Sequence, residues 1–489
     1  MGHDDKYRHP AACLRGPGVL GPFDDRKLWM PRIKRGMTAA AVATVLSACI
    51  NPQTSSPPTP NTWIDSATED AAWPADRWWT AFNSPELNQL IETGLAENRD
   101  FAAAAARILQ AEAQAEVSGA GRFPNVSGNS SANRSSRSIP GQASDGNTSI
   151  VSRSARATIQ ATYQLDLFGQ LRNQSAAARQ RIESSQFDRD TVRLTLCASV
   201  ATTYFQLLSA RDRIRTAEGR LKIARQLLAL VETQRRLGTV SDLEVSQQRA
   251  QVAQQEGALS GLRQTERQTL DALAVLTGRA PSDLKIAGAT LVGLDIPEVR
   301  PGIPSDLLAR RPDLRKSESD LAANAFDLTA ARAARFPGIS LTAQAGSASR
   351  ELNDLLSAGT FFRNFAVNLT APIFSGGRLE GQEKLNEARR AELIASYEQA
   401  VLNALRDVED SLIAAREGDA QLDFAGQAAT ESATAFRIAE ARYRAGAQPF
   451  QTVLDAQRSA LSAEDAVAQA RQTRLGAAVG LISALGGGA

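Results

Sequence analysis

Residues 155–172 read ARATIQATYQLDLFGQLR. Small or apolar side chains stand at every odd position from Ala155 to Leu167, and polar side chains stand at the even positions between them. Because successive side chains of a β-strand point to opposite faces, this alternation predicts a strand with one apolar and one polar face. Phe168 and Gly169 then lead into a long run without proline, so we expect a helix directly after the strand.

The same alternation recurs in the chain. We expect four strands, at about 123–133, 154–168, 338–346 and 361–374, with Ser-, Gly- and Asn-rich loops near 134–153 and 346–360. A strand of about 9–11 residues that is apolar outside and polar inside is typical of an outer-membrane barrel. Four strands cannot close a barrel and lipid excludes an open sheet edge, so the chain is expected to oligomerise. Two or three chains would satisfy this pattern, which does not decide between them.

The chain also repeats itself. Arg122-Phe123-Pro124 recurs as Arg335-Phe336-Pro337, and this is one of four collinear matches whose offsets lie between 206 and 213 residues. We therefore expect two tandem copies, residues 63–278 and residues 305–489, joined by a linker at 279–304.

Each copy is predicted to contain a helix, two strands and two further helices. The expected helices lie at about 170–236, 242–277, 312–335, 378–445 and 450–485. In the two longest, apolar or small residues recur every seven positions, for example at Val401, Val408 and Ala415. A seven-residue period predicts coiled-coil packing with left-handed supercoiling, over about 100 Å for the first long helix.

The N-terminal segment has the features of an export signal. A basic cluster at 32–35 precedes a short apolar run that ends in Leu46-Ser47-Ala48-Cys49 and is too short to span a bilayer. We expect residues 1–48 to be a cleaved leader, of which 1–29 precede the true start, and 49–62 to be a Pro-rich tether that begins at a lipidated Cys49. The alternative is a chance cysteine after an ordinary signal peptide.

The composition argues against several classes of function. The 489 residues carry a formal net charge of +2, which argues against a nucleic-acid-binding protein. The only histidines, His3 and His9, lie in the leader, so the mature chain would have no His-dependent triad and no His-ligated metal. The cysteines form no CxxC pair. We expect no catalytic residue, no metal site and no cofactor other than the lipid on Cys49.

Every expected junction between a strand and a helix holds a phenylalanine. These residues are Phe123, Phe168, Phe336 and Phe374. Aromatic residues at one membrane interface form a girdle, so we interpret the four as the interface aromatics of the barrel. The alternative is that they are core residues where domains join.

Several segments together resemble the TolC-like outer-membrane factors, in the lipoprotein branch that serves resistance–nodulation–division (RND) efflux pumps. The resemblance extends from about Trp63 to the C-terminus and is carried by Trp78-Trp79, Ser84 to Leu87, Tyr163 to Gly169, Pro304 to Asp313, Arg442 to Gly446 and Val453 to Arg458. In the specific block Arg310-Arg311-Pro312-Asp313, we expect Pro312 to begin a helix and Asp313 to suit the helix dipole. We assign this block no transport role.

The resemblance implies an α+β membrane protein of defined architecture. Three chains would form a trimeric 12-stranded outer-membrane β-barrel, with four strands per chain, continuous with a long α-helical coiled-coil periplasmic barrel. It further implies a lipid-anchored exit duct in the cell outer membrane that conducts passively. Its partners would be a periplasmic adaptor (membrane fusion protein) and an inner-membrane RND pump.

The family's periplasmic tip, which contacts the adaptor, maps onto two turns. They are Gly238-Thr239-Val240-Ser241 and Gly446-Ala447-Gln448-Pro449, and glycine suits a tight reversal between antiparallel helices. Asp455 matches an acidic position of the family's periplasmic gate, where a ring of carboxylates would favour cations. The neighbouring acid of some relatives is Thr452 here. Taken alone, Asp455 reads as a solvated helix carboxylate and the turns as ordinary turns.

Two other classes of function compete with the duct. A periplasmic adaptor is also lipidated and helical, but it has one helical hairpin between small β domains rather than two repeats with alternating strands. A lipid-anchored periplasmic enzyme is disfavoured by the absence of mature histidines and of any nucleophile motif.

Overall fold

The structure, a computed structural model, describes residues 63–64, 73–139, 148–299, 302 and 304–488. These residues all belong to one unit of the chain, which spans 54–489. The expected leader, Cys49 and the tether up to residue 62 lie outside the described residues.

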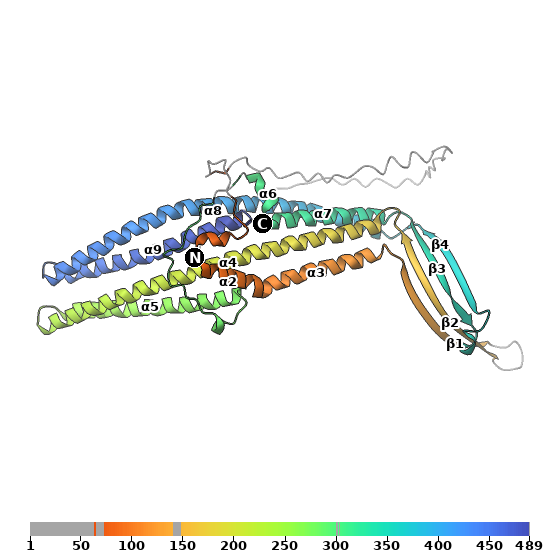
Figure 1. Ribbon diagram of the computed structural model, residues 1–489, viewed down its shortest axis with the longest axis horizontal. Coiled ribbons are helices and arrows are strands. Elements are labelled where there is room, and N and C mark those ends of the chain that lie inside the picture. The colour runs from red at the N-terminus through yellow and green to blue at the C-terminus, as the bar shows by residue number, and fades with distance from the viewer. Residues whose placement is uncertain (1–62, 65–72, 140–147, 300–301, 303, 489) are drawn as a thin grey trace, which may run out of the picture. The chain divides into compact units, whose positions relative to one another are not determined.

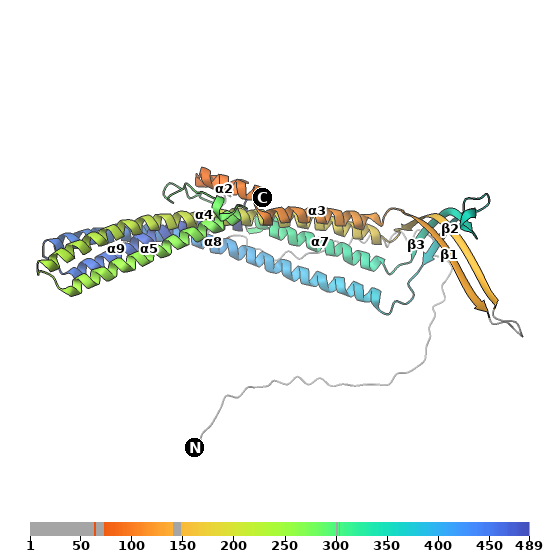
Figure 2. The ribbon, with the colours of Figure 1, turned by 90° about the horizontal axis from the view of Figure 1, so that it is seen from below.

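Two helical hairpins of equal length form most of the structure. In the first, α4 (Gln170–Arg236) is followed by α5 (Asp242–Leu276), and in the second α8 (Arg378–Arg444) is followed by α9 (Phe450–Ala484). The longer helix of each hairpin has 67 residues and the shorter has 35. Both hairpins turn back at the same end, away from the sheet (Figures 1 and 2).

Shorter helices flank the hairpins. α3 (Arg99–Ala120) packs along α4, and α7 (Pro312–Ala333) packs between α4 and α8. The contacts therefore follow the order α3–α4–α7–α8 near the sheet and α5–α4–α9–α8 toward the hairpin turns. The remaining helical segments are η1 (Trp78–Phe82), α2 (Pro85–Glu97), η2 (Pro281–Asp283), η3 (Pro304–Asp306), α6 (Leu307–Arg310) and η4 (Leu352–Asp354).

Four antiparallel strands form one sheet. Its order is β1 (Asn125–Ile139), β2 (Thr148–Leu165), β3 (Gly338–Ser349) and β4 (Phe361–Thr370). β1 follows α3, β2 leads into α4, β3 follows α7 and β4 leads into α8. All four strand–helix junctions therefore lie at the same end of the sheet (Figure 1).

The strands extend further toward the loops than the alternation predicts. β1 reaches Ile139 and β2 begins at Thr148, so much of the loop expected at 134–153 is paired strand, and β3 extends to Ser349. The added residues are mostly polar on both faces. Backbone hydrogen bonds hold such a ladder without any alternation of hydrophobicity, which is why the sequence pattern missed it.

At the helix end, two strands stop earlier than expected. β4 ends at Thr370, two residues before Pro372, because proline cannot donate to the ladder. β2 ends at Leu165 rather than at Phe168. The Asp166 carboxylate instead accepts the backbone N–H groups of Leu171 and Arg172, at 3.2 and 2.7 Å, and so satisfies the start of α4.

The largest buried cluster lies where the N-terminal helices meet the middle of α4. Trp78, Trp79 and Phe82 pack with α2 against α4, and the Phe82 and Phe205 ring centroids are 5.1 Å apart. Cys197 lies in the same cluster, and burial raises the pKa of its thiol to about 11. The seven-residue series of α4 and α8 are buried or partly buried throughout.

The linker between the two repeats is packed rather than loose. Leu284 and Leu291 are buried in the main cluster. The Glu86 carboxylate accepts the backbone N–H groups of Ala287 and Gly288, at 2.6 and 2.9 Å. Among the described residues, no helix has a stretch both long and apolar enough to cross a membrane.

Candidate functional site

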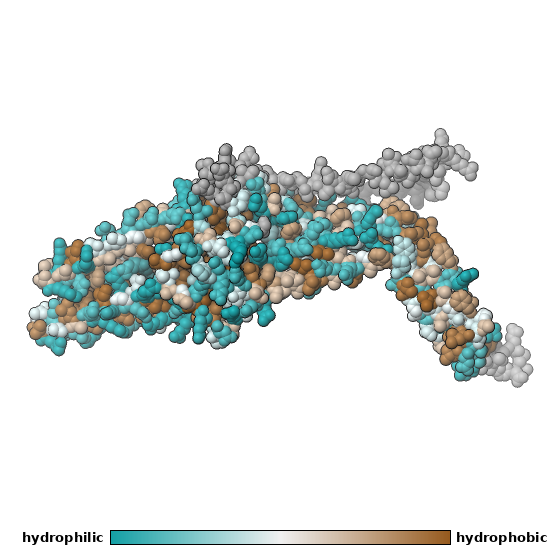
Figure 3. All heavy atoms as spheres, in the orientation of Figure 1, coloured by the Kyte–Doolittle hydropathy of each residue, from teal (hydrophilic) through white to brown (hydrophobic). Residues whose placement is uncertain are grey.

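The strand register gives the part of the sheet next to the helices one apolar and one polar face. Apolar side chains share two neighbouring cross-strand rows: Leu165, Ile339 and Leu369 in one, and Tyr163, Leu341 and Val367 in the next. The residues between these rows face the other side and are polar: Gln164, Ser340 and Asn368. In Figure 3, apolar residues gather over the sheet next to the helices, whereas hydrophilic residues cover most of the helical surface.

The sheet is open at both edges. β1 and β4 stand at the two ends of the strand order, so within the described residues each pairs on one side alone. A row of unpaired backbone groups beside an exposed apolar face needs a partner strand if the sheet is to lie in lipid.

The helix at the β4 side carries an exposed apolar stripe. On α8, Leu402, Ile413 and Phe424 follow each other at intervals of eleven residues, which is about three turns, and Phe424 is 68% exposed. The buried seven-residue series of α8 faces away from this stripe and packs on α7 and α9. At the other side, α3 exposes Leu109 and Val117.

The four junction phenylalanines lie where the strands meet the helices, and all of them are exposed. Phe123 and Phe374 are 71% and 91% exposed, so the structure does not support the alternative that they are core residues. Phe168 and Phe336 stack with ring centroids 4.7 Å apart. Exposed aromatic rings at one height of the sheet suit a boundary between lipid and water.

The turns at the far ends of the hairpins have the same backbone geometry. Gly238 and Gly446 adopt φ values of +80° and +70°, which L side chains rarely adopt. After each helix, the glycine N–H and the next N–H donate back to carbonyls in the last helical turn: Gly238 to Arg235, Thr239 to Gln234, Gly446 to Tyr443 and Ala447 to Arg442. This is the Schellman motif, so glycine is needed here for a physical reason.

The two turns differ in the side-chain contacts that stabilise them. Across the first, Arg235 donates two hydrogen bonds to Asp242, at 2.6 and 2.8 Å, and these hold the pKa of the Asp242 carboxyl below its usual value. The described residues place no ion pair across the second turn, where the rings of Tyr443 and Phe450 pack at 5.2 Å between centroids.

Contacts between α4 and α8 place the two turns next to each other. The Tyr443 hydroxyl donates to Gln234 Oε1 at 2.8 Å, and burial raises the pKa of Tyr443. Val231 of α4 lies in one buried cluster with Phe436 and Phe450. Both predicted tip segments therefore belong to one end of the helical layer.

Asp455 lies on the exposed face of α9, and its side chain is 60% exposed. Gln451 Nε2 donates to its carboxylate at 3.1 Å, and Arg458 Nη1 lies 3.9 Å away. The buried residues of this turn, Val453 and Leu454, face the other side. Asp455 is therefore a solvated helix carboxylate within the single chain, and any ring of carboxylates requires further copies.

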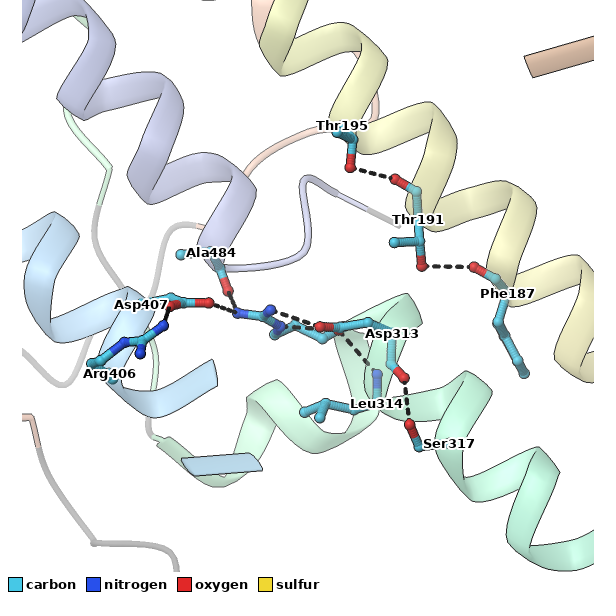
Figure 4. A network of polar contacts seen from close by, with 10 residues as sticks. Phe187, Thr191, Thr195, Asp313, Leu314, Ser317, Arg406, Asp407 and Ala484 are labelled. Atoms are coloured by element: carbon cyan, nitrogen blue, oxygen red, sulfur yellow. Dashed lines mark hydrogen bonds and ion pairs between the residues drawn. The ribbon is translucent and has the colours of Figure 1, made fainter. Parts of the chain in front are cut away.

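Sequence reasoning missed the part that Arg311 plays. Pro312 is the first residue of α7 and Asp313 lies in its first turn, as expected. The Arg311 guanidinium donates to both Asp313 oxygens at 3.0 and 2.7 Å and to the Ala484 carbonyl oxygen at 3.2 Å, and it lies 3.5 Å from Asp407 (Figure 4). Burial lowers the pKa of this guanidinium, but the two carboxylates outweigh burial and raise it. The network joins the start of α7 to α8 and α9, and no local sequence signal identifies these distant partners.

Together, the two-faced open sheet, the exposed aromatic junctions and the paired helical hairpins define a subunit of an outer-membrane channel. The chain belongs to the outer membrane efflux protein family, whose sequence model matches residues 90–279 and 303–487. The interval between the two matched segments falls inside the expected linker.

Similar proteins extend over nearly the whole chain. The pyoverdine export outer membrane protein OpmQ of Pseudomonas putida is 38% identical over 93% of this chain and 98% of its own length. The probable outer membrane lipoprotein SilC of Salmonella typhimurium is 30% identical over 91% and 96%. The open state of the Neisseria gonorrhoeae MtrE outer membrane channel superposes with a TM-score of 0.80 at 30% identity, covering 89% of this chain and 98% of MtrE.

These findings confirm the expected fold class, that of the trimeric TolC-like outer-membrane barrels with long periplasmic helices. The chain is the outer-membrane exit duct of a tripartite efflux system, and it lies in the outer membrane and extends into the periplasm. Members of this family are channels and efflux ducts rather than enzymes.

Proposed function

We propose that three copies of the chain join edge to edge into a passive duct, with β4 of each chain pairing with β1 of the next. The observation that carries this proposal is the sheet that is open at both edges and apolar on one face. Closure of the three sheets into one barrel removes both edges and turns the apolar face to lipid. The polar face, which carries Gln164, Ser340 and Asn368, then lines the water-filled interior.

The helical edges support the same pairing. The apolar stripe of α8 stands on the β4 side of the chain, and α3 with α5 stands on the β1 side. Placing the stripe at Leu402, Ile413 and Phe424 against α3 and α5 of the next chain removes exposed apolar surface from water. The helical barrel then closes together with the strand barrel.

The turn segments Gly238–Ser241 and Gly446–Pro449 form the docking surface for a periplasmic adaptor, which connects the duct to an inner-membrane RND pump. Their adjacency supports this, since three copies would present six turns at one end. The duct itself takes no cofactor or metal and catalyses no reaction, and the pump supplies both energy and selectivity. The four junction phenylalanines contact lipid at the periplasmic boundary of the barrel.

Asp455 serves as the gate residue. Three solvated carboxylates around one axis would form a ring that attracts cations and repels anions. Arg458, 3.9 Å away, reduces this charge in the separate chain. Cys49 carries the lipid anchor after removal of residues 1–48, which the basic cluster and the Leu-Ser-Ala-Cys ending support.

The experiment is single-channel recording of the purified protein in planar bilayers. A closed-tip duct gives small conductance steps, and Asp455→Ala enlarges them or weakens block by divalent cations. Gln451→Ala, one turn away, is the control: it keeps the carboxylate and removes only the hydrogen bond that Gln451 donates to it, so it separates the effect of the charge from the effect of that contact. A protein that inserts into the bilayer without any conductance contradicts the duct, and unchanged steps in Asp455→Ala contradict the gate alone.

A further inference from the structure

Two arginines oppose each other near the loop end of the sheet. Arg134 on β1 pairs with Arg153 on β2, in a register that continues without a bulge from Asn125↔Thr162 to Ile139↔Thr148. Directly opposed side chains in an antiparallel pair lie about 5 Å apart at their Cβ atoms, so two like charges here destabilise the isolated sheet. An anion bound between the two arginines would remove this repulsion.

Both arginines lie on the apolar face of the sheet. On β1, Arg134 stands eight residues after Val126, which belongs to the apolar face. On β2, Arg153 stands six residues before Ile159, which belongs to the same face. Side chains an even number of positions apart point to the same face of a strand. Arg137, three residues after Arg134, belongs to the opposite face.

The height of the pair along the barrel follows from the strand length. Arg153 is twelve residues beyond Leu165, which is about 40 Å along the strand and about 30 Å along the membrane normal for a strand tilted by roughly 40°. The apolar band of an outer-membrane barrel is about 25 Å tall. If the chain forms the proposed barrel, the arginines therefore stand just outside the band, at the level of the extracellular lipid headgroups.

The surrounding charges leave the site cationic. A hollow of about 310 Å³ is lined by Arg134, Arg153, Arg350 and Glu351, together with six residues without charge. Glu351 Oε1 lies 3.2 Å from Arg153 Nη1 and neutralises one of the three arginines. Within the described residues, Arg134 and Arg350 form no ion pair, and both are exposed.

We propose that Arg134 and Arg153, with Arg350 lining the same hollow, bind the phosphate groups of a phosphorylated lipid headgroup in the outer leaflet. Arginine matches phosphate with two parallel hydrogen bonds, and two opposed guanidinium groups can hold one phosphate between them. The position on the outer face favours a lipid rather than a solute leaving the duct, because a solute would meet the inner face.

The test measures binding of diphosphoryl lipid A to the full-length protein in detergent micelles by native mass spectrometry. The double variant Arg134→Gln/Arg153→Gln should bind about twenty-five-fold more weakly, since each arginine near a lipid surface contributes about fivefold. Arg137→Gln is the matched control, because it removes the same charge from the same strand on the other face, and it should bind as the unmodified protein does.

Two further arms separate the sources of phosphate. Dephosphorylated lipid A should bind no better to the unmodified protein than to the double variant, and inorganic phosphate at the same concentration should not displace diphosphoryl lipid A. Equal binding of diphosphoryl lipid A to the double variant and the unmodified protein overturns the site. The double variant should retain its channel conductance, so a loss of lipid binding with intact conductance supports the lipid site. An unmodified protein without conductance would contradict the proposed duct instead of the lipid site.

Discussion

The two long helices α4 and α8 have equal length and begin at equivalent points of the two repeats, yet they are covered differently. Position 205 of α4 corresponds to position 413 of α8, since both helices have 67 residues. Phe205 is completely buried under Phe82 and the N-terminal helices, whereas Ile413 is exposed. The first repeat covers its long helix with its own chain, and the second leaves the equivalent face exposed.

This difference separates folding from assembly. Helix α4 lies in the interior of the helical layer, with neighbours on both sides, and α8 lies at one of its edges. A substitution in the buried face of α4 should therefore lower the free energy of unfolding of the chain. A substitution at the equivalent position of α8 should instead weaken the association of chains.

The largest effect is expected for Phe205→Ala. It removes a fully buried ring and leaves a cavity in the main cluster, which should cost about 3–5 kcal/mol of unfolding free energy. Denaturant unfolding followed by circular dichroism measures the loss. A cost below about 1 kcal/mol would show that this cluster does not hold α4 in place.

Ile413→Asp together with Phe424→Asp should leave the chain folded and prevent assembly. A carboxylate buried without a partner costs several kcal/mol, which exceeds what one interface position can compensate. Size-exclusion chromatography with light scattering reports the change from assembled to single chains. The control is Gln421→Asp, on the same exposed part of α8 but off the stripe, and an assembled double variant would refute the edge contact.

Arg311→Ala tests the network that joins the second repeat. Its loss leaves Asp313, Asp407 and the Ala484 carbonyl without their shared cation, and we expect about 2–4 kcal/mol of destabilisation. Arg310→Ala, which removes a neighbouring arginine stacked on Trp73, is the matched control. Thermal unfolding of both variants should separate them, and equal melting temperatures would argue against the network.

The turns should respond equally to loss of glycine. Gly238→Ala and Gly446→Ala each force an L side chain into positive φ, at a cost of about 1 kcal/mol. Because a Cβ at either site would meet nothing within 4 Å, strain rather than collision sets this cost. Unfolding midpoints measure it, and a several-fold larger loss at one turn would show that the two are not equivalent.

Acid should distinguish the same two turns. The folded pKa of Asp242 is depressed by hydrogen bonds from Arg235, so its contribution is present above the ordinary carboxyl value of 3.8 and is lost as the pH falls below that value. Hydrogen exchange at Gly238–Ser241 should rise relative to Gly446–Pro449 between pH 5 and about pH 3, after correction for intrinsic rates. Asp242→Asn should remove this difference, and a difference that persists in the variant would have another origin.

The sequence predicted the helices well because a seven-residue period and glycine turns are local signals. It predicted the strands only where their two faces differ in polarity, as around Ile159 and Leu341. Beyond that band, β1 and β2 continue with Ser, Asn and Arg, which look the same in a loop as in a strand outside the membrane. Nor could the sequence show that the apolar residues at Leu402, Ile413 and Phe424 of α8 are exposed whereas Phe205 of α4 is buried. Burial at these positions depends on which other segments of the chain pack on each helix.

The number of chains in the assembly tests the trimeric duct most directly. Native mass spectrometry of the purified, full-length protein in detergent gives that number. Edge-to-edge closure predicts a mass of three chains, with lipid on each, and its collapse to one chain in Ile413→Asp/Phe424→Asp. A folded protein that stays a single chain or a dimer under conditions where it conducts would contradict the trimeric duct.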